Sequence, residues 1–372
     1  MERVLVTGGL GFIGSHTVDR LIESGYSVTV LDNLERQVHL GKMPEYRNPD
    51  AEYIIGDVRF KKHWKKALKD VDYIIHLAAS TGSSQSYLES KKYTEVNATG
   101  TAILLDLLLK NRNLYRNVKK IVFSSSSYLY GEGSYFCTTH GIVYPPQRTI
   151  KELCSKRWNL HCPICSGEVD PVGTDEMKPL HLPNPYSLSK FYSEKLLSLY
   201  SELLSIPVLS LRYFNVYGPR QSLNNPYTGV MTVFISRLKN SRPPIIYEDG
   251  LMTRDFVFVK DVANINFEAL RSGEGVFNVG TGKATSILAV YMDISRKLGS
   301  EIDPSFSYES RPGDIRNIFA DNKKLKKAFP SISFTKLNDG ITELLEWSSS
   351  LHSIDLFDKV ESERKQFLSL NR

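Results

Sequence analysis

The chain of 372 residues contains no long apolar run and little cysteine. Because no segment is long and apolar enough to cross a bilayer, we expect no contact with a membrane. Met1-Glu2-Arg3 leads directly into a predicted strand, so we expect no signal peptide and a cytoplasmic location. Internal repeats and low-complexity tracts are also lacking, which argues against a repeat array or a disordered chain.

The chain also lacks a large excess of either sign of charge, because it contains 47 Lys and Arg and 41 Asp and Glu, which gives a net charge of +6. Part of this excess lies around Trp64, where lysines alternate with Ala67 and Leu68 as on the solvated face of a short helix. No motif that reads nucleic acid accompanies the lysines, so we expect no nucleic-acid partner. The positive balance can instead help to attract an anionic substrate.

The four cysteines all fall within residues 137–180. Two pairs of candidate metal ligands have the same spacing, Cys137-x-x-His140 and Cys162-x-x-Cys165. Structural zinc commonly uses such pairs to hold a small loop that lacks its own core, and Cys154 or His161 could replace one ligand of the set. The alternative is a loop with free thiols, since disulfides are not expected in a reducing compartment.

Glycines are abundant where the first predicted strand, residues 3–6, ends. Gly9, Gly11 and Gly14 form G-x-G-x-x-G, and Gly8 adds another flexible position. Such glycines allow a tight turn, a close approach of backbone to a pyrophosphate, and packing of the next helix on the strand. The helix N-terminus would then face the pyrophosphate, which predicts a dinucleotide site.

A second predicted strand, residues 27–31, ends on Asp32. A dinucleotide-binding fold places a carboxylate there for the hydroxyls of the adenine ribose. The same carboxylate would repel a 2′-phosphate, so Asp32 favours NAD over NADP.

Strands and helices alternate in the sequence to about residue 213, which predicts an α/β fold with a doubly wound parallel sheet of the Rossmann type. Ligands bind at the carboxyl ends of such strands, where small residues such as Ala78 and Ala79 let a cofactor approach and Asp57 could reach adenine. Beyond Tyr213 the alternation stops, and prolines punctuate shorter segments. This change predicts a smaller C-terminal α/β lobe that binds substrate.

The expected organisation has four parts. The NAD-binding domain comprises residues 1–136 and 181–213 and regains 254–277, because the alternating segment 253–259 returns the chain to the sheet. The cysteine-containing insertion is 137–180. The substrate-binding lobe comprises 214–253 and 278–346, and residues 347–372 form a terminal helix and tail.

Tyr186 and Lys190 share one face of a helix that Pro185 opens, because they are four residues apart. An ammonium beside the phenol would lower the phenol pKa from its usual value of about 10. Tyrosine and lysine so arranged are a candidate catalytic base.

Together these segments resemble the extended short-chain dehydrogenase/reductase family, especially its nucleotide-sugar epimerases and dehydratases. The resemblance covers about residues 1–330. Besides the glycine turn and the Tyr186/Lys190 pair, the resemblance rests on these segments: Asp32-Asn33-Leu34, Gly56-Asp57-Val58, His76-Leu77-Ala78-Ala79, the serines before Tyr130-Gly131, residues 212–220 and 254–256, and Arg311-Pro312-Gly313-Asp314. Segments 31–39, 130–133, 225–230 and 247–250 and the Cys-Pro-x-Cys insertion are similar to the group that acts on dTDP-L-rhamnose.

The resemblance implies a catalytic set of Ser126, Tyr186 and Lys190. It implies that the substrate contacts Ser126, Asn215, Tyr247, Arg254, Arg311 and Asp314, since arginine suits a diphosphate through its planar donor fork. The cofactor-binding set is Gly8, Gly11, Phe12, Ile13, Gly14, Asp32, Asn33, Asp57, Val58, Leu77, Ala78, Ala79, Asn97, Ser124, Tyr186 and Lys190. A nucleotide-sugar substrate and a homodimer follow from the same resemblance.

The implied reaction is a 4-epimerisation. The sugar is oxidised at C4, the keto-sugar rotates in the site, and the hydride returns to its other face. Related dehydratases carry a glutamate two residues after the catalytic serine position, whereas Ser127 and Tyr128 follow Ser126 here. The expected substrate is a dTDP-6-deoxyhexose such as dTDP-L-rhamnose. The alternatives are epimerisation of UDP-glucose or a UDP-N-acetylhexosamine, a net 4-oxidoreductase, and a non-enzymatic NAD-sensing regulator.

Overall fold

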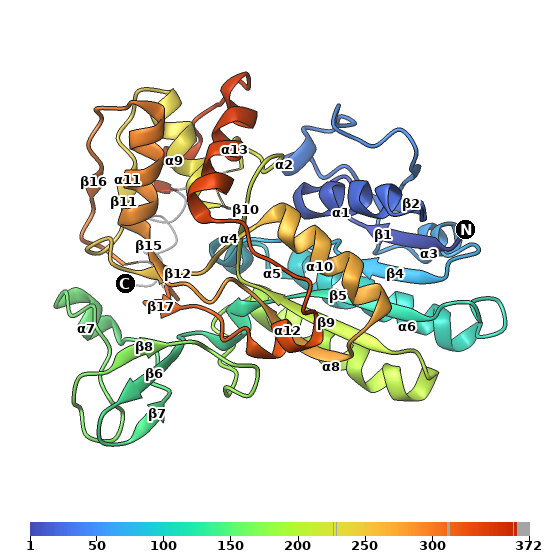
Figure 1. Ribbon diagram of the computed structural model, residues 1–372, viewed down its shortest axis with the longest axis horizontal. Coiled ribbons are helices and arrows are strands. Elements are labelled where there is room, and N and C mark those ends of the chain that lie inside the picture. The colour runs from blue at the N-terminus through green and yellow to red at the C-terminus, as the bar shows by residue number, and fades with distance from the viewer. Residues whose placement is uncertain (226, 228, 311–312, 360, 363–372) are drawn as a thin grey trace.

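The protein is built on a parallel sheet of seven strands, which confirms the predicted fold class (Figure 1). The computed structural model describes residues 1–225, 227, 229–310, 313–359, 361 and 362. The strands lie in the order β14-β9-β5-β4-β1-β2-β3, and every neighbouring pair is parallel. Their bounds are β1 Arg3–Thr7, β2 Ser27–Asp32, β3 Glu52–Ile55, β4 Tyr73–His76, β5 Lys120–Ser126, β9 Val208–Tyr213 and β14 Gly275–Val279.

Helices cover both faces of this sheet (Figure 1). On one face α1 (Phe12–Glu23), α10 (Val259–Arg271) and α12 (Lys323–Ala328) enclose a core with Val4, Val6 and Val30. On the other face α3 (Lys61–Ala67), α6 (Gly100–Lys110) and α8 (Pro185–Leu204) pack over Leu5 and Ile74. Burial on both faces explains why the strands are almost continuously apolar. No helix in the described part of the chain is long and apolar enough to cross a membrane.

Shorter helices connect these layers. The chain enters α6 through α4 (Ser83–Leu88), α5 (Ser90–Tyr93) and a turn of π-helix, η1 (Thr94–Thr99). Helix α2 (Arg36–His39) follows β2, and the 3₁₀-helix η2 (Ser127–Tyr130) follows β5.

The strand order reverses between β1 and β4. From β1 the first half of the sheet runs outward to β2 and β3, whereas from β4 the second half runs to β5, β9 and β14. The connections therefore diverge at the carboxyl ends of β1 and β4, where doubly wound sheets have their ligand crevice.

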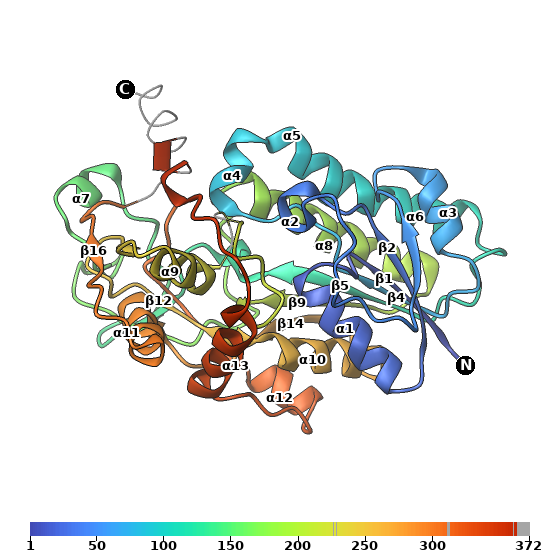
Figure 2. The same cartoon turned by 90° about the horizontal axis from the view of Figure 1, so that it is seen from above.

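The second lobe combines helices with small sheets (Figure 2). Its core lies between α9 (Val230–Lys239), α11 (Ile287–Leu298) and α13 (Leu337–Ser349). The strands of its small sheets are β10 (Asn215–Tyr217) with β13 (Phe256–Phe258), β11 (Ile245–Ile246) with β16 (Ser305–Phe306), and β12 (Thr253–Arg254) between β15 (Thr285–Ser286) and β17 (Asn317–Ile318).

Residues 253–259 do not return the chain to the large sheet as one strand, so that expectation is wrong. The segment divides at Asp255 into β12 and β13, which join different small sheets. The buried carboxylate of Asp255 accepts the backbone N–H groups of Thr281, Gly282 and Ala320, which binds this point of the chain to two other loops. The chain regains the large sheet afterwards, through α10 and β14.

The cysteine-containing insertion forms an antiparallel sheet in the order β7-β6-β8, with a short helix beside it (Figure 1). The bounds are β6 Ser134–Cys137, β7 Gly141–Val143, α7 Ile150–Cys154 and β8 Asp170–Val172. Its buried apolar cluster is small and comprises Tyr135, Cys137, Val143, Leu160 and Cys162.

Helix α8 is fixed to the sheet by a buried ion pair. Glu194 accepts hydrogen bonds from Arg212 of β9 at 2.6 and 3.1 Å and from Ser125 of β5 at 2.6 Å. The Glu194 and Arg212 side chains are only 3% and 5% exposed. Arg212 also donates to the hydroxyl of Tyr130 at 2.8 Å, so the pair joins α8 to three neighbouring segments.

Glu194→Gln should lower the free energy of unfolding by about 3 kcal/mol, because the buried guanidinium of Arg212 would lose its charged partner. Urea denaturation followed by circular dichroism measures the change. Lys195→Gln is the control, since Lys195 is exposed on the same helix and its substitution should change stability by no more than about 0.5 kcal/mol. Equal stability of the two variants would contradict the anchoring role of Glu194.

Candidate active site

The glycine turn after β1 is shaped for close backbone contact. Gly8 has a φ of +70°, and a Cβ at this position would lie 2.9 Å from the backbone nitrogen of Ala78. A Cβ at Gly14 would lie 2.0 Å from the carbonyl oxygen of Gly8, so only glycine allows α1 to approach the turn this closely. The unpaired N–H groups at the start of α1 face an anion favourably. This turn fits the pyrophosphate of a dinucleotide.

Asp32 places a buried carboxylate at the end of β2. Its oxygens accept the backbone N–H groups of Leu10 at 3.1 Å and Leu34 at 2.9 Å. Burial raises the pKa of the Asp32 carboxyl, and these two hydrogen bonds act in the opposite direction. The carboxylate lines the same crevice as the glycine turn, so it stands where ribose hydroxyls could donate to it.

Most of the predicted cofactor-binding residues line one crevice. Its walls include Gly8, Gly11, Phe12, Ile13, Gly14, Asp32, Asn33, Val58, Leu77, Ala78, Ala79, Ser124, Tyr186 and Lys190.

Asp57 and Asn97 are not among the lining residues of this crevice. Asp57 forms an ion pair with Arg59 at 2.7 Å and accepts a hydrogen bond from Asn33 at 3.2 Å. The Asn97 side chain accepts the backbone N–H of Ser80 at 2.8 Å and donates to the hydroxyl of Ser189 at 2.9 Å. Asn97 therefore holds the backbone of Ser80, which lines the crevice, without lining it itself.

The three predicted catalytic residues come from two neighbouring elements. Helix α8 begins at Pro185, and the side chain of Asn184 caps it by accepting the backbone N–H of Ser187 at 2.8 Å. Tyr186 and Lys190 follow on this helix, and Tyr186 is hydrogen-bonded to Ser126 at the end of β5.

The ionisation of this pair is influenced most strongly by burial. Burial raises the pKa of Tyr186 to about 12, and its hydrogen bond with Ser126 opposes this rise only in part. Burial lowers the pKa of Lys190 to about 7, against a smaller opposing effect of Glu194. The Lys190 ammonium donates to Ser124 at 3.2 Å and lies 4.6 Å from the centre of the Phe123 ring. Burial is thus the larger influence on both groups in the chain by itself, and the lowering of the Tyr186 pKa by a Lys190 ammonium stays a prediction.

A network of side-chain amides near the crevice was missed from the sequence. Gln37 donates to the side-chain oxygens of Gln85 and Asn225, both at 3.0 Å, and Gln85 donates back to Gln37 at 2.9 Å. All three residues line the crevice. Gln37 and Asn225 fall in segments that carried the family resemblance, but nothing in the sequence indicates that they meet Gln85.

The predicted substrate residues of the second lobe do not line this crevice. The buried Arg254 guanidinium donates to the carbonyl oxygens of Thr253 at 2.8 Å and Arg316 at 3.4 Å, and Tyr247 is hydrogen-bonded to Glu361. Asn215 begins β10, and the carbonyl oxygen of Asp314 accepts from Arg148 at 3.2 Å. Arg311, the remaining residue of the set, lies outside the described residues.

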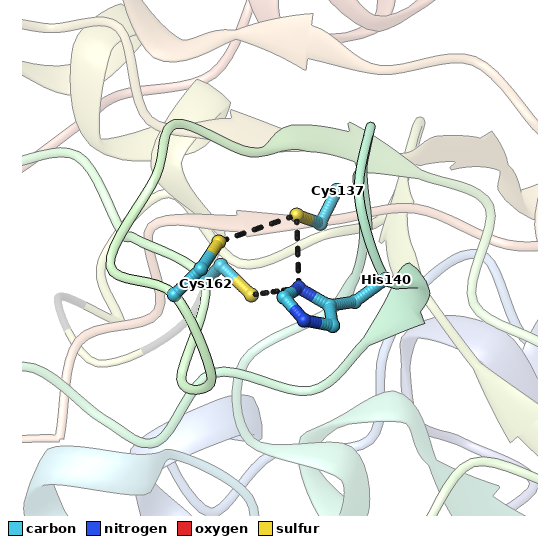
Figure 3. A group of neighbouring side chains, drawn as sticks. Cys137, His140 and Cys162 are labelled. Atoms are coloured by element: carbon cyan, nitrogen blue, oxygen red, sulfur yellow. Dashed lines mark hydrogen bonds between the residues drawn. The ribbon is translucent and has the colours of Figure 1, made fainter.

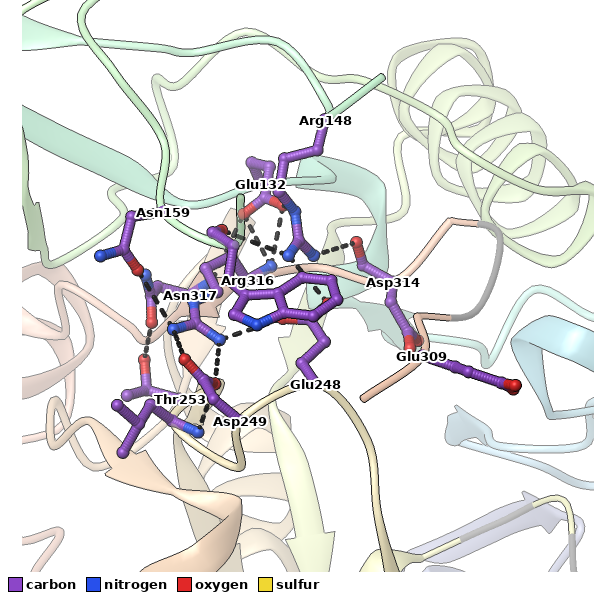
Figure 4. A network of polar contacts seen from close by, with 12 residues as sticks. Glu132, Arg148, Asn159, Glu248, Asp249, Thr253, Glu309, Asp314, Arg316 and Asn317 are labelled. Atoms are coloured by element: carbon purple, nitrogen blue, oxygen red, sulfur yellow. Dashed lines mark hydrogen bonds and ion pairs between the residues drawn. The ribbon is translucent and has the colours of Figure 1, made fainter. Parts of the chain in front are cut away.

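A buried charge network joins the insertion to the second lobe (Figure 4). Arg148 of the insertion lies 2.8 Å from Glu248, and Arg316 lies 3.0 Å from the same carboxylate and 2.6 Å from Asp249. Glu132 accepts the backbone N–H of Arg316 at 2.8 Å. These charges are far apart in the sequence, so no local pattern predicts their contact.

The sequence matches the model of the NAD dependent epimerase/dehydratase family over residues 4–149 and 165–280, with an interruption inside the insertion. It is 35% identical over 348 residues to a putative UDP-glucose 4-epimerase of Methanocaldococcus jannaschii, which covers 92% of this chain and 97% of the relative. It is also 35% identical over 356 residues to dTDP-L-rhamnose 4-epimerase of Burkholderia thailandensis, with 93% and 94% covered. The structure of Thermus thermophilus UDP-glucose 4-epimerase complexed with NAD aligns with a TM-score of 0.73 and 30% identity, over 94% of this chain and all of that one.

The lowered pKa of Lys190 should appear in the pH dependence of stability. Between its folded value of about 7 and its unfolded value of about 10.4, the unfolded chain holds a proton that the folded chain has released. The free energy of unfolding of the wild type should therefore rise relative to that of Lys190→Met, by about 3 kcal/mol from pH 7 to pH 10. Urea denaturation across this range measures it. Lys195→Met is the control and should follow the wild type, and parallel curves for the wild type and Lys190→Met would contradict the lowered pKa.

Proposed function

The chain belongs to the NAD-dependent epimerase/dehydratase family, and we propose that this NAD-dependent nucleotide-sugar 4-epimerase acts on a dTDP-6-deoxyhexose such as dTDP-L-rhamnose. The observation that carries the proposal is that Tyr186 and Lys190 both line a crevice that fits a dinucleotide, where Tyr186 is hydrogen-bonded to Ser126. The full-length similarity to a dTDP-L-rhamnose 4-epimerase supports the choice of sugar.

In the proposed reaction, bound NAD would supply the acceptor of the C4 hydride and afterwards its donor. Tyr186 would accept the proton of the C4 hydroxyl and later return it, which is the general acid–base role that its place at the crevice allows. Ser126 would hold the reacting oxygen by a hydrogen bond. Lys190 would bind the nicotinamide ribose, and as a cation it would favour the phenolate form of Tyr186.

The residues that follow Ser126 favour epimerisation over elimination of water. An elimination across the sugar needs a further acid or base at the reacting centre, and Ser127 and Tyr128 offer no carboxyl group there. Asp32 and Glu35 are the carboxylic acids among the described residues that line the crevice. Asp32 lies at the end of β2, which β1 and β4 separate from β5 and Ser126, and its carboxylate accepts hydrogen bonds from two backbone N–H groups.

The nucleotide end of the substrate would meet the second lobe. We assign this contact to Asn215, Tyr247, Arg254, Arg311 and Asp314, as the family resemblance implies. Arg254 supports the assignment, because in the bonds that the structure describes its buried guanidinium donates to backbone carbonyls, and its charge interacts with Glu132 without a hydrogen bond between the two side chains. A homodimer is part of the same proposal.

The main alternative is a 4-epimerase of UDP-glucose or a UDP-N-acetylhexosamine, since one of the two relatives at 35% identity is a putative UDP-glucose 4-epimerase. A net 4-oxidoreductase is a second alternative. An NAD-sensing regulator is disfavoured by the presence of Tyr186 and Lys190, because a protein without catalysis has no need of either group.

Incubation of the purified protein with dTDP-L-rhamnose should invert the configuration at C4, which NMR of the sugar detects. Parallel incubations with UDP-glucose and UDP-N-acetylglucosamine should give at least about tenfold lower rates. The loss of one contact to the base or the sugar lowers the rate by about this factor. Conversion of a UDP-sugar alone would overturn the substrate choice. No conversion of any nucleotide sugar by protein that contains NAD would favour the regulator.

Tyr186→Phe should lower the turnover number by about 100-fold or more, because it removes the group that moves the proton, while NAD binding is retained. Epimerase rates and NAD content of the purified variant measure the two effects. Tyr192→Phe is the matched control on the same helix, since Tyr192 is 50% exposed and should retain wild-type activity. Full activity of Tyr186→Phe would remove Tyr186 from the proton transfer.

A further inference from the structure

Three cysteines and one histidine converge at one end of the insertion, outside the crevice (Figure 3). Cys137 ends β6, and His140 lies in the turn between β6 and β7. Cys162 and Cys165 lie in a second turn, which the bridge between His161 and Glu168 closes. The four candidate ligand atoms all lie within 4.8 Å of one another. We propose that these residues bind one structural zinc ion.

The distances between these atoms match a tetrahedral zinc site. With Zn–S bonds of about 2.3 Å and a Zn–N bond of about 2.1 Å, a tetrahedron places two sulfurs about 3.8 Å apart and sulfur and nitrogen about 3.6 Å apart. The Sγ atoms of Cys137 and Cys165 are 3.8 Å apart. His140 Nδ1 lies 3.6 Å from the Sγ atoms of both Cys137 and Cys162. Three thiolates and one neutral imidazole are a common ligand set for structural zinc.

The backbone of both turns supports bound thiolates. Backbone groups of Thr139 and His140 hydrogen-bond to Cys137, and a backbone group of Gly167 hydrogen-bonds to Cys165. A Cβ at Gly167 would lie 3.3 Å from the Cys165 Sγ, so a larger residue would crowd this sulfur. Such hydrogen bonds orient ligands and stabilise their charge, which is a usual feature around protein-bound metals.

The insertion has too little apolar burial to hold this arrangement without help. Two of the five buried residues in its apolar cluster are the proposed ligands Cys137 and Cys162. Several larger apolar side chains of the insertion are exposed instead: Phe136, Ile142, Tyr144, Ile150 and Ile164. Small units without a sufficient core commonly depend on a metal, and the free energy of zinc binding then contributes directly to folding.

The proposed zinc also closes the loop that reaches the second lobe. Residues 141–161 run between the two ligand pairs and carry Arg148 and Asn159. Arg148 lies 2.8 Å from Glu248, and Asn159 accepts a hydrogen bond from Arg316 at 3.1 Å (Figure 4). Joining the ends of a loop reduces the number of conformations that it can adopt, so zinc would favour the form in which these contacts are made.

Metal analysis of the full chain, purified without chelators or a metal-affinity column, tests the site directly. We expect about one zinc per chain in the wild type and less than about half an equivalent in Cys162→Ser, which lacks one ligand. Cys154→Ser is the matched control, because Cys154 is exposed in α7 and lies outside the cluster, so this variant should retain its zinc. A thiol reagent should react rapidly with Cys154 alone, and with the other three cysteines only as zinc is released.

A second measurement covers the case in which Cys162→Ser does not fold. Removal of zinc from the wild type should speed amide hydrogen exchange in residues 134–172 and leave β1 and β2 protected, and added Co²⁺ should give the absorption of a tetrahedral thiolate complex. Less than about half an equivalent of zinc in the wild type, with all four thiols freely reactive, would overturn the proposal. A disulfide between Cys137 and Cys165, detected by mass spectrometry, would overturn it as well. None of these readouts depends on epimerase activity.

Discussion

The buried carboxylate of Glu194 makes the contacts on which the placement of α8, the helix of the proposed catalytic residues, depends. It receives hydrogen bonds from Ser125 of β5 and Arg212 of β9, so α8 is tied to two adjacent strands at the depth of the core. A buried charge pair stabilises little compared with apolar packing of equal volume, but it penalises any shift that separates the charges. The pair therefore fixes the helix along its axis, which determines where Tyr186 and Lys190 meet the ends of the strands.

The same contact extends beyond the sheet. Arg212 also donates to Tyr130, whose hydroxyl donates to Asn278 of β14 at 2.7 Å. The side chain of Asn278 donates to the carbonyl oxygen of Thr174, just after the last strand of the insertion. One chain of buried polar contacts thus leads from α8 to the insertion, and each member has a partner, as buried polar groups require.

The parts of the fold and site that the sequence could predict are those in which local chemistry determines position. Gly8, Gly14 and Asp32 stand at strand ends whose apolar runs are visible in the sequence, and Pro185 with the cap of Asn184 defines the start of α8. The contacts of Gln37 with Gln85 and of Arg148 with Glu248 join residues that are distant in the sequence. No periodicity or turn signal encodes such a pairing, because it depends on how two lobes and an insertion are placed against each other. The break at Asp255 was missed for the same reason, since its partners Thr281 and Ala320 follow much later in the chain.

The ionisation of the proposed catalytic pair, Tyr186 and Lys190, shows why residue spacing alone does not determine a pKa. Four-residue spacing correctly placed Tyr186 and Lys190 on one helix, but it carries no information about solvent. In the structure Lys190 is buried and Tyr186 is half-buried, and desolvation disfavours the charged form of each, which raises the pKa of Tyr186 and lowers that of Lys190. At neutral pH the Tyr186 phenol of the chain by itself is therefore protonated, whereas Lys190, with a pKa of about 7, is charged in about half of the molecules. Further positive charge in the crevice would add to that of the Lys190 ammonium in favouring the phenolate, and oxidised NAD carries such a charge on its nicotinamide ring. The burial that opposes ionisation in the chain alone would thereby make proton transfer from a sugar depend on the oxidised cofactor.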